Sequence, residues 1–211
     1  MKSREVILGA VCSHLRRTPD SDVAAPPPVP ALGRVDLPAA GRLEQFAQRL
    51  RDVGGTFHLG LDDGGLAAVT GLLARLAPRS IAASDARAVQ ALRQHAQLAP
   101  YAWLPAAATH EQLFAADVGI TGAQWAIAET GTLVLDSAQE RHRLASLLPP
   151  VHIALLPVSR LLCSMGEVLK TLDRPLPCAA TFVTGPSRTA DIELKLIVGV
   201  HGPRELHVVV V

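Results

Sequence analysis

Two nearly continuous apolar stretches constrain the fold more than any other feature of this sequence. They are VHIALLP (151–157) and ELHVVVV (205–211). A strand that is apolar at consecutive positions, rather than at every second one, is typical of a sheet that is covered on both faces. Helices usually supply that cover, so the two stretches predict an α/β domain.

The residues from 41 to about 100 alternate between helical and extended patterns. Apolar side chains recur at helical spacing in several segments, and short apolar stretches follow two of them. We expect helices at 41–55, at 64–78 and after the capping residue Asp85, and strands at 56–61 and 79–84. This order of strand and helix is typical of a parallel sheet with covering helices.

The remaining residues predict more strands and two more helices. Alternation on both sides of Thr130-Gly131 predicts that 118–136 forms two strands joined at a tight turn. The SAQE segment (137–140) fits a capping box that begins a helix. A further helix is expected at 159–172, and further strands at 179–185, 193–202 and 205–211. Together these elements predict a three-layer α/β/α domain with a mixed, mainly parallel sheet.

The first 40 residues differ in composition from the rest. Apolar residues at helical spacing predict an amphipathic helix near the N-terminus rather than a signal peptide. A cluster of prolines then excludes a helix or a central strand. We expect a helical arm at 1–17, a Pro-rich linker at 18–40 and a single α/β domain at 41–211. The arm packs either on this domain or on a neighbouring subunit, and in the second case the protein is a homo-oligomer.

Composition and charge argue against several classes of function. The net charge is +1, no run of Lys or Arg is present, and aromatic residues make up only 3% of the chain, so a nucleic-acid partner is not expected. No apolar stretch approaches the roughly 18 residues of a spanning helix, so we expect no membrane span and a cytoplasmic location. The cysteines form no C-x-x-C pair and the histidines have no metal-ligand spacing, so neither a metal site nor a cofactor is expected on this chain.

The first of three polar clusters is Glu129-Thr130-Gly131-Thr132, which follows an expected strand. The glycine allows unusual backbone angles and the threonines suit a turn. A carboxylate at the end of a buried strand can act as a nucleophile, a base or a substrate-orienting group, which makes Glu129 a candidate catalytic residue. A hairpin turn with an exposed glutamate explains the same four residues equally well.

The second cluster is TGPSRTADIE (184–193), and the third is HGPR (201–204). If a helical turn begins in the second cluster, its free N–H groups and Arg188 favour an anion, although two nearby acids oppose this. The same residues can also simply begin a helix. The third cluster is ordinary turn chemistry, although its His201 and Arg204 could approach the other clusters at a shared sheet edge.

Two segments together resemble a known family. GITGAQWAIAETGTLVL (119–135) and GPSRTADIELKLIVGVHGPRELHVVVV (185–211) are similar to the lactate utilization protein C family, the LUD-domain proteins. The resemblance covers roughly Asp117 to Val211. It implies a fold like that of ribose-phosphate isomerases and CoA transferases. It also implies a role with two iron–sulfur partner proteins that oxidise L-lactate to pyruvate and carry the clusters themselves.

We interpret the 184–193 segment as one wall of a small-anion pocket, which the first cluster faces. Arg188 would bind a carboxylate or phosphate through paired hydrogen bonds, and Asp191 would orient Arg188 or a ligand hydroxyl. The expected binding residues are Thr130, Gly131, Thr132, Gly185, Ser187, Arg188, Thr189, Asp191, His201 and Arg204.

Three hypotheses for the function follow. The chain is a subunit of an L-lactate-oxidising complex that binds a small anionic metabolite, or it is a non-catalytic assembly subunit. Alternatively, it is a stand-alone enzyme that acts on a phosphorylated or CoA-linked metabolite through Glu129. Some CoA transferases use a strand-end glutamate in a Glu-Asn-Gly turn, which Glu129-Thr130-Gly131 resembles.

Overall fold

The structure is a computed structural model, and it describes residues 2–15, 37–60, 63–105, 107–140, 143–172, 177–190, 196–198 and 202–211. The chain divides into two units, Met1–Arg34 and Val35–Val211. The described part of the first unit is helix α1 (Lys2–Leu15), on which Val6, Ile7, Leu8 and Val11 are exposed.

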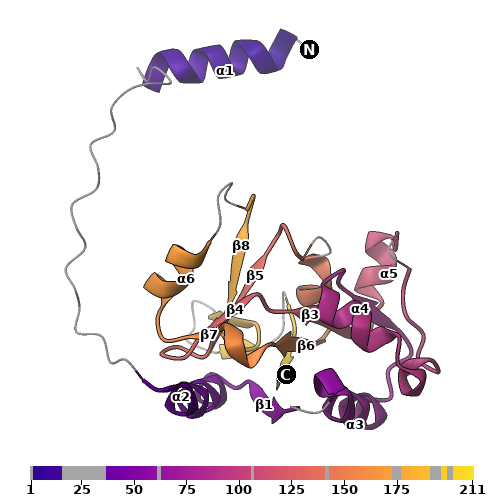
Figure 1. Ribbon diagram of the computed structural model, residues 1–211. Coiled ribbons are helices and arrows are strands. Elements are labelled where there is room, and N and C mark those ends of the chain that lie inside the picture. The colour runs from indigo at the N-terminus through magenta and orange to yellow at the C-terminus, as the bar shows by residue number, and fades with distance from the viewer. Residues whose placement is uncertain are drawn as a thin grey trace. The chain divides into compact units, whose positions relative to one another are not determined.

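A five-stranded parallel sheet forms the centre of the second unit (Figure 1). Its order is β1 (Thr56–Leu59), β11 (Glu205–Val210), β6 (Val151–Leu156), β3 (Val118–Gly122) and β2 (Ile81–Ala83), and every neighbouring pair is parallel. The two apolar stretches that predicted the fold class are therefore adjacent strands in the middle of the sheet.

Both faces of this sheet are covered, as the continuous apolar stretches predict. In β6, Ile153 and Leu155 pack in a core with helices α3 (Leu66–Leu76) and α4 (Arg87–Arg93). Their neighbours Ala154 and Leu156 point to the other face. There they pack with helix α2 (Ala39–Asp52) and with strands of a second sheet. Successive residues of one strand thus contribute to two separate cores.

The second sheet has four strands in the order β7 (Leu161–Leu162), β4 (Trp125–Ile127), β5 (Thr132–Asp136) and β8 (Ala180–Val183). Strands β4 and β5 form an antiparallel hairpin around Thr130-Gly131, as the sequence predicts. Helix α6 (Met165–Thr171) covers one face through Val168. One sheet is thus entirely parallel and the other is mixed. The chain passes from one to the other through a short connection, because only Ala123 and Gln124 separate β3 from β4.

Four local predictions are wrong. Asp85 does not cap the following helix, because the N-cap residue of α4 is Ala86 and no side chain caps it. Residues 118–136 form three strands, not two. The SAQE segment begins no α-helix, because Glu140 is buried and bonds to Gly122 and Gln124 instead. Residues 159–172 do not form one helix, because Leu161 and Leu162 pair with β4 as strand β7 before α6 begins.

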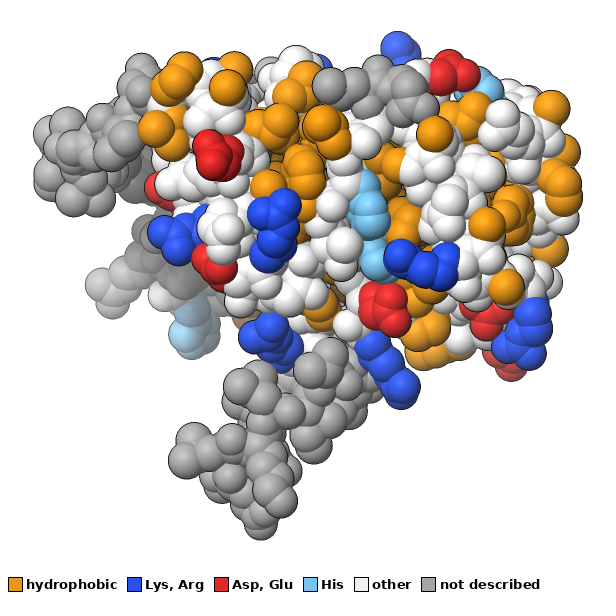
Figure 2. Space-filling view, turned by 90° about the horizontal axis from the view of Figure 1, so that it is seen from below, with side chains coloured by type: hydrophobic (Ala, Val, Ile, Leu, Met, Phe, Trp, Pro, Cys, Tyr) orange, Lys and Arg blue, Asp and Glu red, His pale blue; other side chains and the backbone are white. Residues whose placement is uncertain are grey.

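One short helix and one pair of strands lie outside the two sheets and the helices described above. Helix α5 (His110–Phe114) begins at Thr109 with a capping box that involves Gln112. Strands β9 (Arg188–Ala190) and β10 (Leu196–Val198) form a separate antiparallel pair. On the face that Figure 2 shows, basic and acidic side chains are interspersed among apolar ones. This distribution is in keeping with a net charge of only +1.

Candidate functional site

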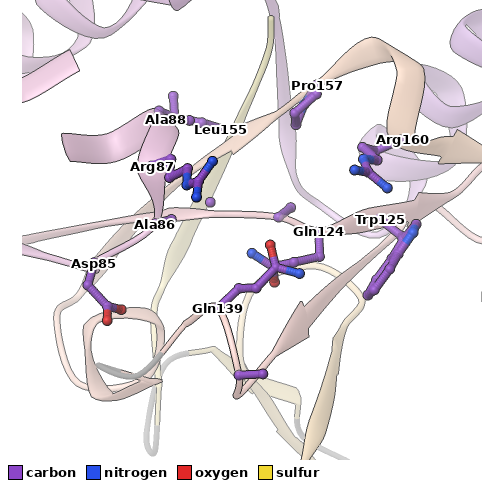
Figure 3. Close-up of a pocket in the computed structure, with 13 residues that line it drawn as sticks. Asp85, Ala86, Arg87, Ala88, Gln124, Trp125, Gln139, Leu155, Pro157 and Arg160 are labelled. Carbon is purple, nitrogen blue, oxygen red and sulfur yellow. The ribbon is translucent and has the colours of Figure 1, made fainter. Parts of the chain in front are cut away.

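An open crevice of about 540 Å³ lies at the carboxyl ends of the parallel strands β3 and β6 (Figure 3). Its lining comes from the start of α4, the connection between β3 and β4, the turn after β5 and the residues that follow β6. In α/β proteins this edge of the sheet is the usual place for a ligand. The crevice is therefore the candidate functional site.

Two arginines reach the crevice from opposite sides in Figure 3. Arg87 is the first residue of α4, and Arg160 ends a 3-10 turn that its own N–H closes with the carbonyl of Pro157 at 2.8 Å. Within the described parts of the chain, neither guanidinium has a hydrogen bond or an ion pair. Two unpaired guanidinium groups beside one cavity favour a carboxylate or phosphate ligand.

The side-chain amide of Gln124 has a fixed orientation at the floor of the crevice. Its Oε1 accepts a hydrogen bond from the N–H of Asp136 at 2.7 Å, and its Nε2 donates to Glu140 at 3.1 Å. The backbone donor defines which end of the amide carries the oxygen. The second N–H of Nε2 is thus free of these two bonds and gives the crevice a neutral donor beside the arginines.

Glu140 is completely buried behind this amide. Its Oε1 accepts from the N–H of Gly122 at 2.9 Å and from Gln124. Among the described residues Oε2 has no partner of standard hydrogen-bond geometry, although the Ser84 hydroxyl is close enough to favour the charged form. The pKa of Glu140 is raised to about 7, chiefly by burial and to a smaller extent by the negative charge of Asp85, while the hydrogen bonds from Ser84, Gln124 and Gly122 oppose the rise.

Two buried histidine contacts lie elsewhere in the parallel sheet. His152 is buried and its Nε2 is 2.8 Å from the hydroxyl of Thr121. Burial, with a smaller effect of the neighbouring His207, lowers the pKa of His152 to about 4. His207 in turn lies between His58 and Glu205, at 3.2 Å from each. Desolvation lowers the pKa of both His207 and His58.

The structure brings part of the first and second predicted clusters together. The hydroxyl of Thr132 is 2.7 Å from that of Thr130 and 2.7 Å from that of Thr184. Thr132 is buried, whereas Thr130 is exposed. Gly131 has φ 67°, and a Cβ there would lie 2.5 Å from the backbone nitrogen of Leu50 in α2. This glycine is therefore required by a left-handed backbone and by close packing on a helix.

Glu129 does not face the second cluster. It is exposed, and its Oε1 accepts a hydrogen bond from the N–H of Met165 at the start of α6, at 3.2 Å. Its own N–H donates to the carbonyl of Cys163 at 3.2 Å. These contacts place Glu129 in the connection between the β4–β5 hairpin and α6.

The described part of the second cluster, residues 184–190, leads into strand β9 and contains no helical turn. Gly185 has φ 82°, and a Cβ there would approach the carbonyl of Val53 at the end of α2. The same carbonyl accepts a hydrogen bond from Nη2 of Arg188 at 2.6 Å. Ser187 donates its N–H to the carbonyl of Pro203 at 2.8 Å. Arg188 is thus engaged by the protein itself.

The remaining predicted residues are less informative. Arg204 is exposed, and its N–H donates to the carbonyl of Pro150 at 2.7 Å. Thr189 lies in β9, but its side chain is outside the described structure, as are the whole of Asp191 and His201. The two described cavities are both lined by other residues.

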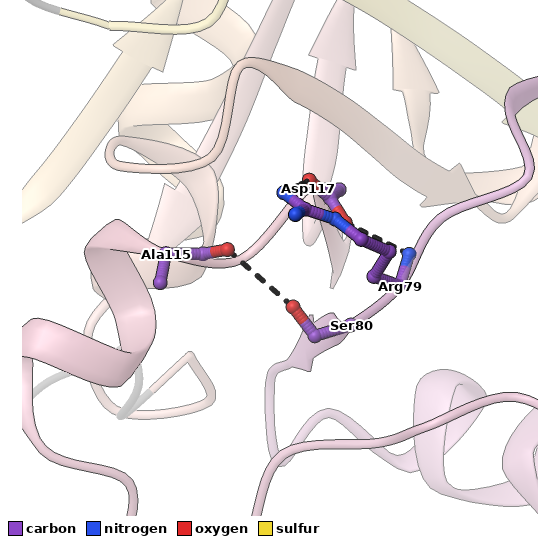
Figure 4. Close-up of polar contacts among 4 residues, drawn as sticks. All are labelled: Arg79, Ser80, Ala115 and Asp117. Carbon is purple, nitrogen blue, oxygen red and sulfur yellow. Dashed lines mark hydrogen bonds and ion pairs between the residues drawn. The ribbon is translucent and has the colours of Figure 1, made fainter.

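The second cavity, of about 330 Å³, lies at the opposite edge of the sheet, where β3 and β6 begin. Figure 4 shows the ion pair beside it. Asp117 accepts from the N–H of Arg79 at 2.8 Å and from its guanidinium at 3.1 Å. The Arg79 guanidinium lowers the pKa of Asp117. Both charges satisfy each other, so this pair joins the starts of β2 and β3 and leaves no free charge for a ligand.

The sequence predicts no ligand-binding role for the charged and amide residues of the crevice. These are Asp85, Arg87, Gln124, Gln139 and Arg160, with Glu140 buried behind them. One signal was present, because all of them except Gln124 follow a predicted strand or lie within a segment assigned to a helix start. Gln124 instead lies in the first of the two segments that carry the family resemblance.

The described residues contain neither a metal-ligand group nor a membrane-spanning helix. No group of three or more His, Cys, Asp or Glu side chains in this part of the chain is arranged to hold a metal ion. No helix within the described ranges is long and apolar enough to cross a bilayer.

Comparison with known proteins places these features in a family. The LUD domain model matches residues 80–211. A lactate utilization protein C from Halalkalibacterium halodurans is 45% identical over 102 residues, which are 45% of this chain and 44% of that protein. Another, from Exiguobacterium sp., is 46% identical over 110 residues, or 49% of this chain and 48% of the relative. The matched segments thus span less than half of these relatives.

A solved structure agrees with the fold. The crystal structure of a DUF162 family protein from Deinococcus radiodurans has a TM-score of 0.59 and 28% sequence identity. The match covers 82% of this chain and 98% of that one. The LUD model covers all strands of the parallel sheet except β1, together with the entire second sheet and the crevice. The chain belongs to the LUD domain family.

Proposed function

We propose that this chain is a subunit of an L-lactate-oxidising complex and that it binds a small organic anion in the crevice. Two iron–sulfur lactate utilization proteins would be its partners. Oxidation of L-lactate to pyruvate releases two electrons and two protons, and the partners' clusters would accept the electrons. The similarity to lactate utilization protein C sequences supports the pathway.

The observation that carries the proposal is a pair of guanidinium groups beside one cavity, those of Arg87 and Arg160, which have no partner among the described residues. Lactate and pyruvate are both carboxylates at neutral pH, and guanidinium groups bind carboxylates through charged hydrogen bonds. The free N–H of Gln124 supplies a donor for the adjacent hydroxyl or carbonyl oxygen of such a ligand.

The test measures L-lactate-dependent dye reduction by the two iron–sulfur partners, with and without this chain. We expect activity to require the chain and to fall at least about tenfold with the double substitution Arg87→Gln and Arg160→Gln, since each charged hydrogen bond contributes about 1.5–3 kcal/mol. Arg204→Gln is the matched control, because Arg204 is also exposed but lies outside the crevice. Full activity of the double variant would contradict the proposal.

Calorimetric titration of the purified chain with pyruvate and with L-lactate tests the pocket itself. The double variant should bind either anion at least about tenfold more weakly than the wild type. Binding that is equal in both proteins would place the ligand elsewhere, even if the chain is a subunit of the complex.

The residues predicted from the sequence support a second proposal, an anion contact at Thr130, Thr132 and Arg188. The three linked hydroxyls favour it, because hydroxyl groups can donate to an anion. The bond from Arg188 to Val53 counts against it.

Turnover of a phosphorylated or CoA-linked metabolite by the chain alone, lost in Glu129→Gln, would instead support a stand-alone enzyme.

A further inference from the structure

A buried carboxyl group lies directly beneath the crevice. Glu140 has no exposed surface, yet two residues that line the crevice, Gly122 and Gln124, bond to its Oε1. Only one layer of protein atoms therefore separates this carboxyl from a ligand in the crevice.

The two oxygens of Glu140 have different surroundings. Oε1 accepts two N–H donors, whereas Oε2 is buried without a partner of standard geometry among the described residues. As a carboxylate, Glu140 has no partner of standard geometry at Oε2 among the described residues, which costs free energy in a buried site. Oε2 is thus the oxygen on which a proton would be placed, and the nearby Ser84 hydroxyl opposes this by favouring the charged form.

We propose that Glu140 is a positioning residue for the ligand of the crevice and that it takes up one proton when an anion binds. This inference rests on the proposed function, since it requires an anion in the crevice. The proton comes from solvent and goes to Oε2, so the added negative charge of the ligand is offset by the loss of the negative charge of Glu140.

The other charged groups around Glu140 are consistent with this exchange. The described elements that surround it carry two acids, Asp85 and Asp136, and two bases, Arg87 and Arg160. Asp85 already disfavours the charged form of Glu140, and a bound anion acts in the same direction. Because the pKa of Glu140 is about 7, a modest further rise changes its protonation at neutral pH.

Glu140 also positions the side-chain amide of Gln124 through its hydrogen bond. Glu140 holds Nε2 of Gln124 while Asp136 holds its Oε1, so the amide cannot rotate away from the crevice. Protonation at Oε2 leaves Oε1 free to accept both N–H donors. The donor that Gln124 presents to the ligand is therefore kept when the charge of Glu140 is lost.

The experiment is titration calorimetry of the full chain with pyruvate, whose carboxylate does not change protonation between pH 6 and 8. If the bound anion raises the pKa of Glu140 by about one unit, affinity should fall roughly fivefold from pH 6 to pH 8. At pH 7.5, heats measured in two buffers of different ionisation enthalpy should show uptake of about half a proton per pyruvate bound. A purely structural role would give neither effect.

Glu140→Gln keeps the size and the acceptor of the side chain but cannot titrate. It should bind pyruvate equally at pH 6 and pH 8, without proton uptake. Glu44→Gln, which changes an exposed acid of α2 outside the crevice lining, is the matched control and should retain the roughly fivefold pH dependence of the wild type.

The outcomes distinguish the two proposals. Wild-type binding with equal affinity at both pH values and no proton uptake overturns the role of Glu140 and leaves the proposed function standing. Absence of pyruvate and L-lactate binding at every pH overturns both. Wild-type pH dependence that persists in Glu140→Gln assigns the proton to another group and also overturns the inference. The proton-uptake measurement needs only the wild-type protein, so it stands even if the variant does not fold.

Discussion

The crevice and the threonine cluster are both polar, yet the protein uses their polar groups in opposite ways. In the threonine cluster, Thr130, Thr132 and Thr184 bond to one another, and Arg188 bonds to the end of α2. In the crevice, the guanidinium groups of its two arginines have no described protein partner. Polar groups that satisfy each other hold a fold together, whereas unpaired donors around a cavity remain available to a ligand.

The largest expected effect tests the structural side of this comparison. Gly131→Val forces a branched residue into φ 67° and places its Cβ against the backbone of α2, so we expect a loss of at least about 3 kcal/mol in the free energy of unfolding. Gly64→Ala is the control, because Gly64 has φ 66° but no atom within 4 Å of the new Cβ. It should cost only about 1 kcal/mol. Similar losses in urea unfolding of both variants would show that packing on α2 is unimportant.

The second prediction concerns the crevice and its buried acid, Glu140, whose ionisation should make the free energy of unfolding depend on pH. Below its unfolded pKa of 4.5, Glu140 is neutral in both states and its burial costs no charge. Stability is lost as the pH rises from 4.5 to the folded pKa of about 7, because in this range the unfolded state releases the proton whereas the buried group of the native state retains it. Each pKa unit corresponds to about 1.4 kcal/mol, so the loss reaches roughly 3 kcal/mol above pH 7.

The measurement is urea unfolding of the wild type and Glu140→Gln at pH 5 and pH 8. The wild type should lose stability relative to the variant at pH 8, and the comparison cancels other titrating groups. One of these is His152, whose lowered pKa of about 4 acts in the opposite sense and removes stability as the pH falls from 6.5. A constant difference between the two proteins would show that Glu140 does not titrate in this range.

The smallest effect decides whether the threonine cluster also binds an anion. Arg188→Ala removes an exposed side chain with one hydrogen bond, so the free energy of unfolding should fall by about 1 kcal/mol while pyruvate affinity is unchanged. If Arg188 binds an anion, as expected from the sequence, the same substitution should weaken anion binding instead. Calorimetric titration and urea unfolding of the same variant therefore separate the two regions.

Much of the fold was predictable because it depends on local pattern. The apolar stretches identified β6 and β11, and the Thr130-Gly131 turn identified the β4–β5 hairpin. Strand β7 was not predictable, since two residues give no periodicity and its pairing depends on a partner 35 positions earlier, Ala126 with Leu161. The sheet switch after β3 was hidden for a similar reason, because the linking residues look like the continuation of a strand.

The candidate site was less predictable than the fold. Arg87 and Arg160 are 73 positions apart, and both lie in segments that read as ordinary solvent-exposed helix. Glu140 fits a capping box in sequence, but its hydrogen bonds are made with Gly122 and Gln124, 18 and 16 positions away. Rules based on local sequence predict that a polar side chain bonds to a backbone group close to it in the chain. Only the folded structure shows that the partners are residues distant in sequence.

The short connection between the two sheets has a mechanical consequence. Ala123 and Gln124 are the only residues between β3 and β4, and both line the crevice. The joint between the sheets is therefore made of the same atoms that a ligand would touch. Residues 157–160 also join the two sheets, between β6 and β7, and include Pro157 and Arg160 of the crevice. A ligand in the crevice would therefore contact both connections and restrain how the second sheet is attached to the first.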